Sequence, residues 1–250
     1  MVTLLSLLVV LGAEDPWSEV DGQALPPYPS SGFEVQLAPY TPLIGSPKEQ
    51  KHFKLYFGSS QHFLKLLQLN RYFDTWYGLA GVLMQVGYFK VEGKTRICKA
   101  GESIIPCTSE TLPTSLPGND TTSLTAIPIS LGLLYRLTYL ADAWRIPLFP
   151  YVRGGLDYFF WEAKGGSKVA HTPDKQAGDG GTAGYHGSAG LAVDLDWLDS
   201  GTLGPKRKRA FYSGALFVEY TERFANHFGN TKRLNFSDGY LAFGLSLDLL

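Results

Sequence analysis

Three side chains in the second half of the chain are of the types that a serine hydrolase uses. His186 and Ser188 stand two residues apart, and Glu219 follows in the next patterned segment. A nucleophile, a base and a group that orients the base must contact one another before they can cleave a lipid ester. Alternating polar residues on neighbouring strands produce such a trio by chance. We therefore expect no catalysis and keep a lipid-acting hydrolase as an alternative.

Charged residues that stand alone among uncharged neighbours form a second candidate site. If they share one interior, they could line a selective pore or a binding pocket, or neutralise one another in salt bridges. Buried charges without partners carry a heavy desolvation cost, so we favour a salt-bridge network that fills the interior. Acidic residues outnumber basic ones in this set, which consists of Glu34, Arg136, Arg153, Asp157, Asp194, Asp196, Glu219 and Asp248.

Other motifs suggest no cofactor chemistry. Cys98 and Cys107 lie close together in a polar segment, which fits a local disulfide in an oxidising compartment. No CxxC pair or nearby histidine completes a metal-ligand set, and we expect neither a metal nor a cofactor. The glycine-rich stretch 178–184 lacks the GK[ST] ending of a phosphate-binding loop and is interpreted as a flexible outer loop. The basic run 206–209 is interpreted as a solvated turn near anionic headgroups.

The segment IPISLGLLYRLTYL at 127–140 indicates which elements position these charges. Its odd-numbered residues from Ile127 to Tyr139 are all large and apolar. Its even-numbered residues are mostly small or polar and include Arg136. A β-strand places the two sets on opposite faces, so Arg136 should point away from the apolar face.

The same alternation recurs along the chain and predicts eight strands. Leu79, Leu83, Leu134 and Phe217 are apolar exceptions on the polar faces, and Lys65 is a charged exception on an apolar face. The predicted strands are Phe33–Ala38, Lys65–Asn70, Leu79–Tyr88, Ile127–Tyr139, Val152–Phe160, Tyr185–Trp197, Tyr212–Thr221 and Leu241–Leu249.

The composition of the two faces decides which one points inward. The polar faces are rich in Gly, Ala and Ser with isolated charges, whereas a soluble sandwich or lipocalin would carry long hydrophilic side chains there. Small residues and paired charges suit the narrow interior of an eight-stranded barrel, and the apolar faces should then meet lipid. Long connections near 41–61, 93–124 and 164–182 alternate with tight turns at 73–77 and 141–145. We predict an all-β fold, an eight-stranded antiparallel transmembrane β-barrel.

Tryptophans near the predicted strand ends indicate membrane interfaces. Trp76, Trp144 and Trp197 stand beside predicted periplasmic turns, and Trp161 stands at the other end of its strand. Because amphipathic rings prefer the boundary between lipid and water, we predict that these four residues belong to two girdles.

Composition and the N-terminal region agree with an exported barrel. The 250 residues carry a formal net charge of −1, so no nucleic-acid partner is expected. Residues 1–13 have the short apolar core of a secretory signal peptide. Residues 14–31 are rich in Pro and Ser and are predicted to be a flexible periplasmic lead-in, which leaves 32–250 for the barrel. No segment reaches 18 continuous apolar residues, as a spanning helix would require.

Four segments carry a resemblance to known proteins: FEVQLAPYTPLIGS, GVLMQVGYFKVEGK, GLAVDLDWLD and ALFVEYTE. With the final strand they cover most of 32–250, and the chain resembles small outer-membrane β-barrels of the OmpA, OmpX and OmpW type. It is most similar to an uncharacterised family of single-domain outer-membrane barrels known mainly from myxobacteria. The resemblance implies a fold and a location and carries no catalytic signature. The chain ends in LSLDLL and lacks the terminal aromatic residue of many such barrels.

Together these observations predict a protein of the cell outer membrane with a narrow, charge-filled lumen and a structural, adhesive or surface-display role. Its expected partners are membrane lipids, lipopolysaccharide and the outer-membrane assembly machinery. A small-solute channel and a soluble periplasmic, lipocalin-like binder are the alternatives beside the hydrolase. The sequence does not indicate an oligomeric state.

Overall fold

Eight long strands form a closed ring in the computed structural model of the chain. The structure describes residues 29–44, 50–58, 62–100, 103–105, 115–144, 146–166, 168–169, 178–195, 211–229 and 234–249. The ring strands are β1 (Ser31–Pro39), β2 (Phe63–Thr75), β3 (Gly78–Ala100), β5 (Leu116–Leu137), β6 (Leu148–Gly165), β8 (Asp179–Asp194), β9 (Phe211–Phe224) and β10 (Asp238–Leu249).

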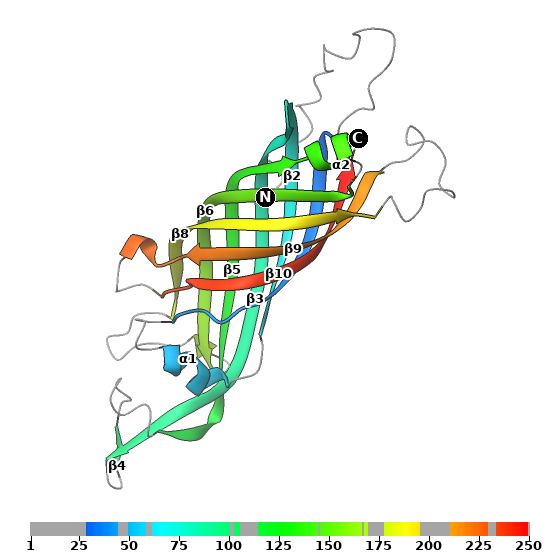
Figure 1. Ribbon diagram of the computed structural model, residues 1–250. Helices are drawn as coiled ribbons and strands as arrows, with labels where there is room; N and C mark the ends of the chain where they lie inside the picture. The colour runs from blue at the N-terminus through cyan, green and yellow to red at the C-terminus, as the bar shows by residue number, and fades with distance from the viewer. Residues whose placement is uncertain are drawn as a thin grey trace.

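Every neighbouring pair in the ring is antiparallel. The order runs β1, β2, β3, β5, β6, β8, β9 and β10, and the pairing of β1 with β10 closes the barrel (Figure 1). The predicted eight-stranded antiparallel barrel is therefore confirmed. Closure removes every strand edge from the ring, which is the way that β structure satisfies its backbone groups in lipid.

The two ends of the barrel carry different short elements and are called the outer and the inner end after the orientation that the sequence predicts. The outer end carries α1 (Gln50–Phe57), β4 (Ser103–Ile105), β7 (Lys168–Val169) and the 3-10 helix η6 (His227–Gly229). The inner end carries α2 (Tyr139–Trp144), the start of β1 and the end of β10 (Figure 1). Neither helix has the length and hydropathy that a membrane crossing by a helix would need, among the residues that the structure describes.

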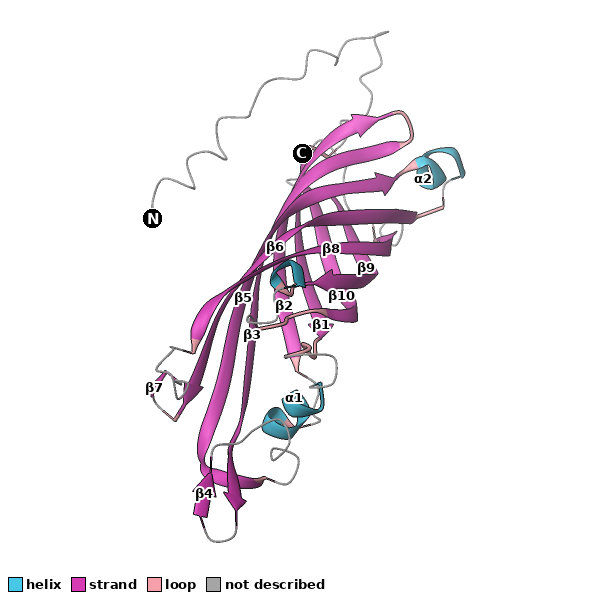
Figure 2. Cartoon of the chain, turned by 90° about the vertical axis from the view of Figure 1, so that its left-hand side faces the viewer, coloured by secondary structure: helices cyan, strands magenta, loops and turns pink. Residues whose placement is uncertain are grey.

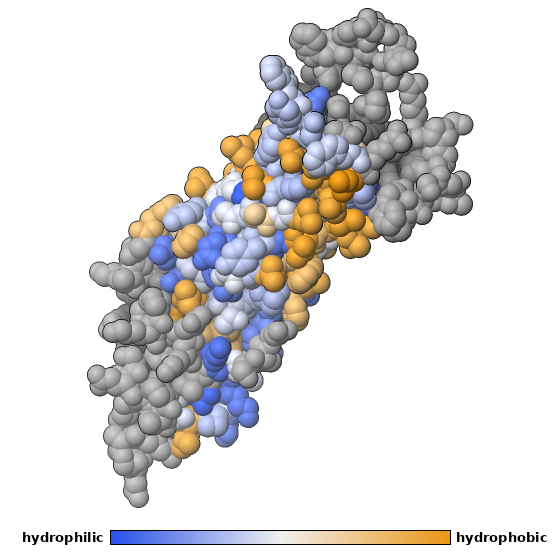
Figure 3. All heavy atoms as spheres, viewed as in Figure 1, coloured by the Kyte–Doolittle hydropathy of each residue, from blue (hydrophilic) through white to orange (hydrophobic). Residues whose placement is uncertain are grey.

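The apolar faces of the strands point outward. Ile129, Leu133 and Leu245 expose 40%, 68% and 51% of their surface, whereas Arg136 and Asp157 expose 6% and 3%. In Figure 3 hydrophobic residues gather along the upper right side of the described surface, and hydrophilic ones dominate toward its lower end. A soluble barrel would have the reverse arrangement, because it would bury its apolar face.

Two strands, β3 and β5, continue well past the others at the outer end. The expected loop at 93–124 is wrong in large part, because β3 extends to Ala100 and β5 begins at Leu116. Figure 2 shows these strands running to β4, with α1 beside them. The outward residues of this extension, such as Lys90, Glu92 and Thr125, are polar, so it lacks the apolar face that identified the other strands.

Smaller corrections concern other connections. The stretch expected as a flexible loop at 178–184 contains the start of β8 at Asp179, and the expected tight turn at 141–145 is largely α2. β1 begins at Ser31, the last residue of the expected lead-in. The predicted signal peptide and the basic run 206–209 lie outside the described residues.

Candidate functional site

Three layers of ion pairs cross the lumen. The layer nearest the inner end joins β5 to β10. Arg136 on β5 contacts Asp248 on β10, with 2.5 Å between Nη1 and Oδ2. The Arg136 guanidinium also donates a hydrogen bond to the Tyr72 hydroxyl at 2.8 Å, and that hydroxyl donates to Asp248 at 3.1 Å. Each of these three side chains is buried. The layer therefore satisfies a carboxylate and a guanidinium inside the barrel.

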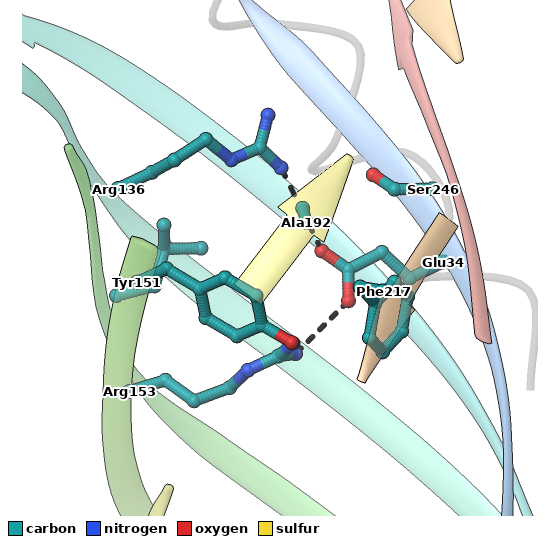
Figure 4. Close-up of a pocket in the computed structure, with 8 residues that line it drawn as sticks. Glu34, Arg136, Tyr151, Arg153, Ala192, Phe217 and Ser246 are labelled. Carbon is teal, nitrogen blue, oxygen red and sulfur yellow. Dashed lines mark hydrogen bonds and ion pairs between the residues drawn. The ribbon is translucent and has the colours of Figure 1, made fainter. Parts of the chain in front are cut away.

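The middle layer is centred on Arg153 of β6. Its Nη1 lies 2.9 Å from Oε2 of Glu34, and its Nε lies 2.5 Å from Oε2 of Glu219. Glu34 also lies 3.9 Å from Arg136, which links this layer to the inner one, as Figure 4 shows. Arg153 stacks near the rings of Tyr151 and Phe217, at 4.6 and 5.6 Å from their centroids. Two carboxylates thus share one guanidinium, which itself rests on aromatic faces.

Side-chain amides connect the middle layer around the wall. Gln68 accepts a hydrogen bond from Arg153 at 2.7 Å and one from Gln85 at 3.1 Å. Asn70 accepts from Gln68 and donates to Glu34, both at 2.8 Å. An amide can donate and accept hydrogen bonds at once, so these linked amides satisfy buried charges without adding new ones.

The outer layer is centred on Asp157. Its carboxylate accepts from Ser130 at 2.5 Å, contacts Nδ1 of His186 at 2.8 Å and lies 3.1 Å from Nε of Arg223. Arg223 also donates to Gln85 at 3.2 Å, across the lumen on β3. Arg223 exposes only 1% of its surface. Asp157 is therefore held by partners from three other strands.

Above these layers the lumen becomes apolar. Phe53 of α1 packs into the outer mouth, and the backbone at Tyr56 lies so close to Gly93 that a Cβ atom there would not fit. Burial raises the pKa of the Tyr56 hydroxyl, and the nearby Arg96 guanidinium opposes that shift. The buried members of this outer cluster are Ala38, Tyr40, Phe53, Leu64, Leu66, Phe89, Val91, Leu124, Ala126, Phe159, Ala225, Phe236, Tyr240 and Ala242.

The four apolar exceptions on the polar faces also fill the lumen. Leu79, Leu83 and Leu134 pack with Tyr72, whereas Phe217 packs with Tyr151 and two alanines. A small cavity of about 10 Å³ remains in the lumen and is lined by Glu34, Arg136 and Arg153 among other residues. That volume holds about one water. A second space beside Arg223 is too small to hold a water molecule.

The three catalytic candidates do not form a triad. Ser188 is 3.0 Å from the Thr221 hydroxyl, and Thr221 donates to Glu219 at 2.9 Å. His186 contacts Asp157 instead. The nucleophile and the base thus have different partners, which disfavours the acyl-transfer arrangement. Among the described residues no cluster of His, Cys, Asp or Glu is suited to hold a metal ion.

The predicted charged residues fall into three groups. Glu34, Arg136, Arg153, Asp157, Glu219 and Asp248 are buried and lie in the layers described above. Asp194, the last residue of β8, is half-buried at the inner end. Asp196 lies outside the described residues.

The predicted girdle and disulfide residues have mixed outcomes. Trp76 and Trp144 are strongly exposed at the inner end. Trp161 packs against the outer apolar cluster inside the barrel, so it does not belong to an outward girdle. Trp197 and Cys107 lie outside the described residues, and Cys98 is buried on β3. The Cys98–Cys107 disulfide therefore stays a prediction.

Sequence reasoning missed several members of the network. Arg223 and the amides of Gln68, Asn70 and Gln85 were not singled out, although the amides face inward on predicted strands. Arg223 lies two residues beyond the predicted end of its strand at Thr221. Continuing the alternation from Glu219 through Thr221 would have placed it on the inner face.

Comparisons with known proteins give fold likenesses alone. No protein-family model and no curated protein matches the sequence. The chain is similar to Ail, the attachment invasion locus protein of Yersinia pestis, solved in complex with the heparin analogue sucrose octasulfate. That likeness has 9% identity and a TM-score of 0.43, over 87% of this chain and 96% of Ail. Neisserial surface protein A is similar at 12% identity and a TM-score of 0.43, over 88% of this chain and 97% of that one. The resemblance to a myxobacterial family stays a prediction.

Proposed function

We propose that this chain is a non-conducting outer-membrane barrel that holds its extended outer strands at the cell surface, in a structural or adhesive role. The observation that carries the proposal is the set of ion pairs that join opposite walls. Arg153 and Glu34 stand on β6 and β1, which are separated by three strands in either direction around the ring. Arg136 and Asp248, on β5 and β10, are separated in the same way. A lumen braced across its diameter leaves no path for a solute.

The outward residues support insertion in a membrane. On β5 the apolar run from Ile127 to Tyr135 measures roughly 27 Å along the strand at about 3.4 Å per residue. The usual strand tilt reduces that length to roughly 20 Å along the membrane normal, which fills most of the roughly 25 Å height of the apolar band on outer-membrane barrels. Exposed aromatic residues border the inner end, where Tyr77 contacts Tyr139 and Tyr139 contacts Trp144. Location in the outer membrane, with lipid, lipopolysaccharide and the assembly machinery as partners, is part of this proposal.

The outer boundary of the band supports surface display. Along β3 the outward residues change from Tyr88 to Lys90, and along β6 they change from Phe160 to Glu162. Lys90 and Glu162 both pair with Thr125 of β5, so the two changes occur at the same level of the barrel. Since β3 and β5 continue far beyond this level, their outer parts would stand in water above the lipid surface. Such an extension offers a surface for contact with other molecules.

Single-channel recording in planar bilayers tests the closed lumen. We expect no steady conductance from protein whose folded state is verified by heat-modifiability on a gel. A matched variant that carries Glu34→Ala, Arg153→Ala and Glu219→Ala removes the middle layer but keeps the inner layer, the outer layer and the apolar cluster, so it should also show no steady conductance if it keeps the same heat-modifiability. Steady conductance of the unchanged protein would make it a small-solute channel and overturn the proposal.

Epitope insertion in cells tests the orientation. A tag inserted at Gly166, in the exposed turn after β6, should bind antibody on intact cells. The same tag between Thr75 and Gly78, in the turn between β2 and β3, should bind only after permeabilisation. The opposite result would reverse the barrel and remove the display role. Release of the protein by buffer alone would favour a soluble binder.

A further inference from the structure

Glu222 is an acidic residue on the outward face of β9, between the exposed rings of Tyr220 and Phe224. The Tyr220 hydroxyl donates a hydrogen bond to Oε2 of Glu222 at 2.7 Å, which orients the carboxylate without neutralising its charge. Glu222 pairs with Gly187 of β8 and Gly239 of β10. Nothing lies within 4 Å of a Cβ atom added at Gly187, so the surface beside the carboxylate is open to a side chain from another molecule.

Lys65 carries the opposite charge on the outward face of β2. Its neighbours on that face are the exposed Phe63 and Leu67, and the residues directly before and after it are buried. Within the part of the chain that the structure describes, neither Lys65 nor Glu222 forms an ion pair. A charge on an apolar, outward face is costly unless it meets an opposite charge or reaches water.

The two charges lie at the same height along the barrel axis. Following the paired residues around the ring from Gly239 leads back to β10 at Leu249, ten residues nearer the inner end. Eight strands with this offset are tilted by roughly 40°. The row of pairs from Lys65 reaches β9 at Val218, roughly 9 Å nearer the inner end. Glu222 lies four residues, or roughly 10 Å in height, back toward the outer end.

We propose that copies of this chain associate side by side in the membrane, with Lys65 of one copy paired to Glu222 of the next. The inference rests on the proposed function, since it requires copies that stand parallel in one bilayer. Because the two charges have the same height, they meet without tilting one copy against the other. The lysine side chain reaches the carboxylate across the open surface over Gly187. Each pair removes two single charges from the apolar faces.

The positions of β2 and β9 determine the kind of assembly. The two strands are separated by β1 and β10, so their outward faces diverge by about 135° around a ring of eight strands. Lys65 and Glu222 of one barrel therefore face different neighbours. A contact between two different faces leaves one Lys65 and one Glu222 for further copies, so the barrels form rows or rings.

Energy transfer between donor-labelled and acceptor-labelled copies of the full barrel tests the proposal in phosphatidylcholine vesicles. The unchanged protein should associate, and either Lys65→Glu or Glu222→Lys should lower the association constant about tenfold, since like charges then face each other. An equal mixture of these two variants should restore association, because each reversed charge then meets a reversed partner. Lys54→Glu, which makes the same charge change on an exposed residue of α1, is the control and should have no effect. All variants must keep the heat-modifiable band.

Three results would overturn the inference. The unchanged barrels could remain monomeric in the vesicles, both charge reversals could leave association unchanged, or the mixture could fail to restore it. A monomeric barrel that inserts and does not conduct would leave the proposed function intact. Failure of the unchanged barrel to insert in vesicles would instead contradict the proposed function itself.

Discussion

Arg153 and Glu34 form an ion pair across the full width of the barrel, with 2.9 Å between Nη1 and Oε2. The two residues are 119 positions apart in sequence and stand on opposite walls. Because Arg153 also holds Glu219, its removal would leave two buried carboxylates without their shared guanidinium. The lumen is therefore sensitive to single substitutions at this residue.

Arg153→Met should lower the free energy of unfolding by about 3–5 kcal/mol, since it strands buried charge. Urea titration in detergent or vesicles measures the change. Lys164→Met, which removes a solvent-exposed partner of Glu162, is the control and should cost less than about 1 kcal/mol. Adding Glu34→Gln and Glu219→Gln to Arg153→Met should recover part of the loss. No recovery would mean that the charges do not balance one another.

Gly132→Val should prevent correct closure between β5 and β6. A Cβ atom at Gly132 would strike the backbone of Gly154, and one at Gly155 would strike the backbone of Leu131. Overpacking of this kind costs about 1–3 kcal/mol or more, because backbone cannot move aside as a side chain can. Gly187→Val is the matched control, since nothing lies within 4 Å of its added Cβ. Equal heat-modifiability of the two variants would argue against a close approach at Gly132.

Gly93→Val should displace α1 from the outer mouth, because the backbone of Tyr56 and Phe57 occupies the space that its side chain needs. We expect faster proteolysis within the outer connection between β1 and β2, with the heat-modifiable barrel retained. Gly165→Val, in the open turn region of β6, should leave the proteolysis rate unchanged, since no atom lies within 4 Å of its Cβ. Unchanged cleavage in Gly93→Val would show that α1 does not depend on this contact.

Ser188→Ala and His186→Ala should leave lipid turnover by the purified barrel at the background rate. Ser188 bonds Thr221 and His186 bonds Asp157, so neither is placed to assist the other. Release of fatty acid from labelled phospholipid vesicles measures turnover. Turnover above background that both substitutions abolish would restore the hydrolase alternative. Both variants must keep the heat-modifiable band for this comparison.

The sequence predicts the barrel wall well because apolar outward residues alternate strictly with small or polar inward residues there. The alternation predicts two-faced strands at Leu241–Leu249 and at Ile127–Tyr139, of which the second ends at Leu137 because Tyr139 begins α2. From Lys90 onward the outward residues of β3 are polar, so the alternation of apolar and polar residues no longer identifies a strand. For that reason the sequence pattern predicts a loop where the structure has the long extension of β3 and β5.

The candidate site was predictable in part for the same reason. Isolated charges such as Asp157 and Glu219 stand out on inward faces, whereas Gln68 and Gln85 look like ordinary polar residues of any surface. Which charge meets which depends on the barrel's register and diameter, which sequence patterns do not determine. Trp161 shows the limit of reasoning from residue type: its position in the alternation places it inside, although tryptophan prefers interfaces.

The braces across the lumen have a consequence for the order of assembly. Arg136 meets Asp248 over a sequence separation of 112 residues, whereas each hairpin of the barrel joins near neighbours. Contacts between residues so distant in sequence stabilise the chain only after the conformational entropy of the intervening loop has been lost, which slows folding. The ion pairs should therefore form last. A chain that stops before β10 would lack Asp248, and Arg136 would then lose its carboxylate partner.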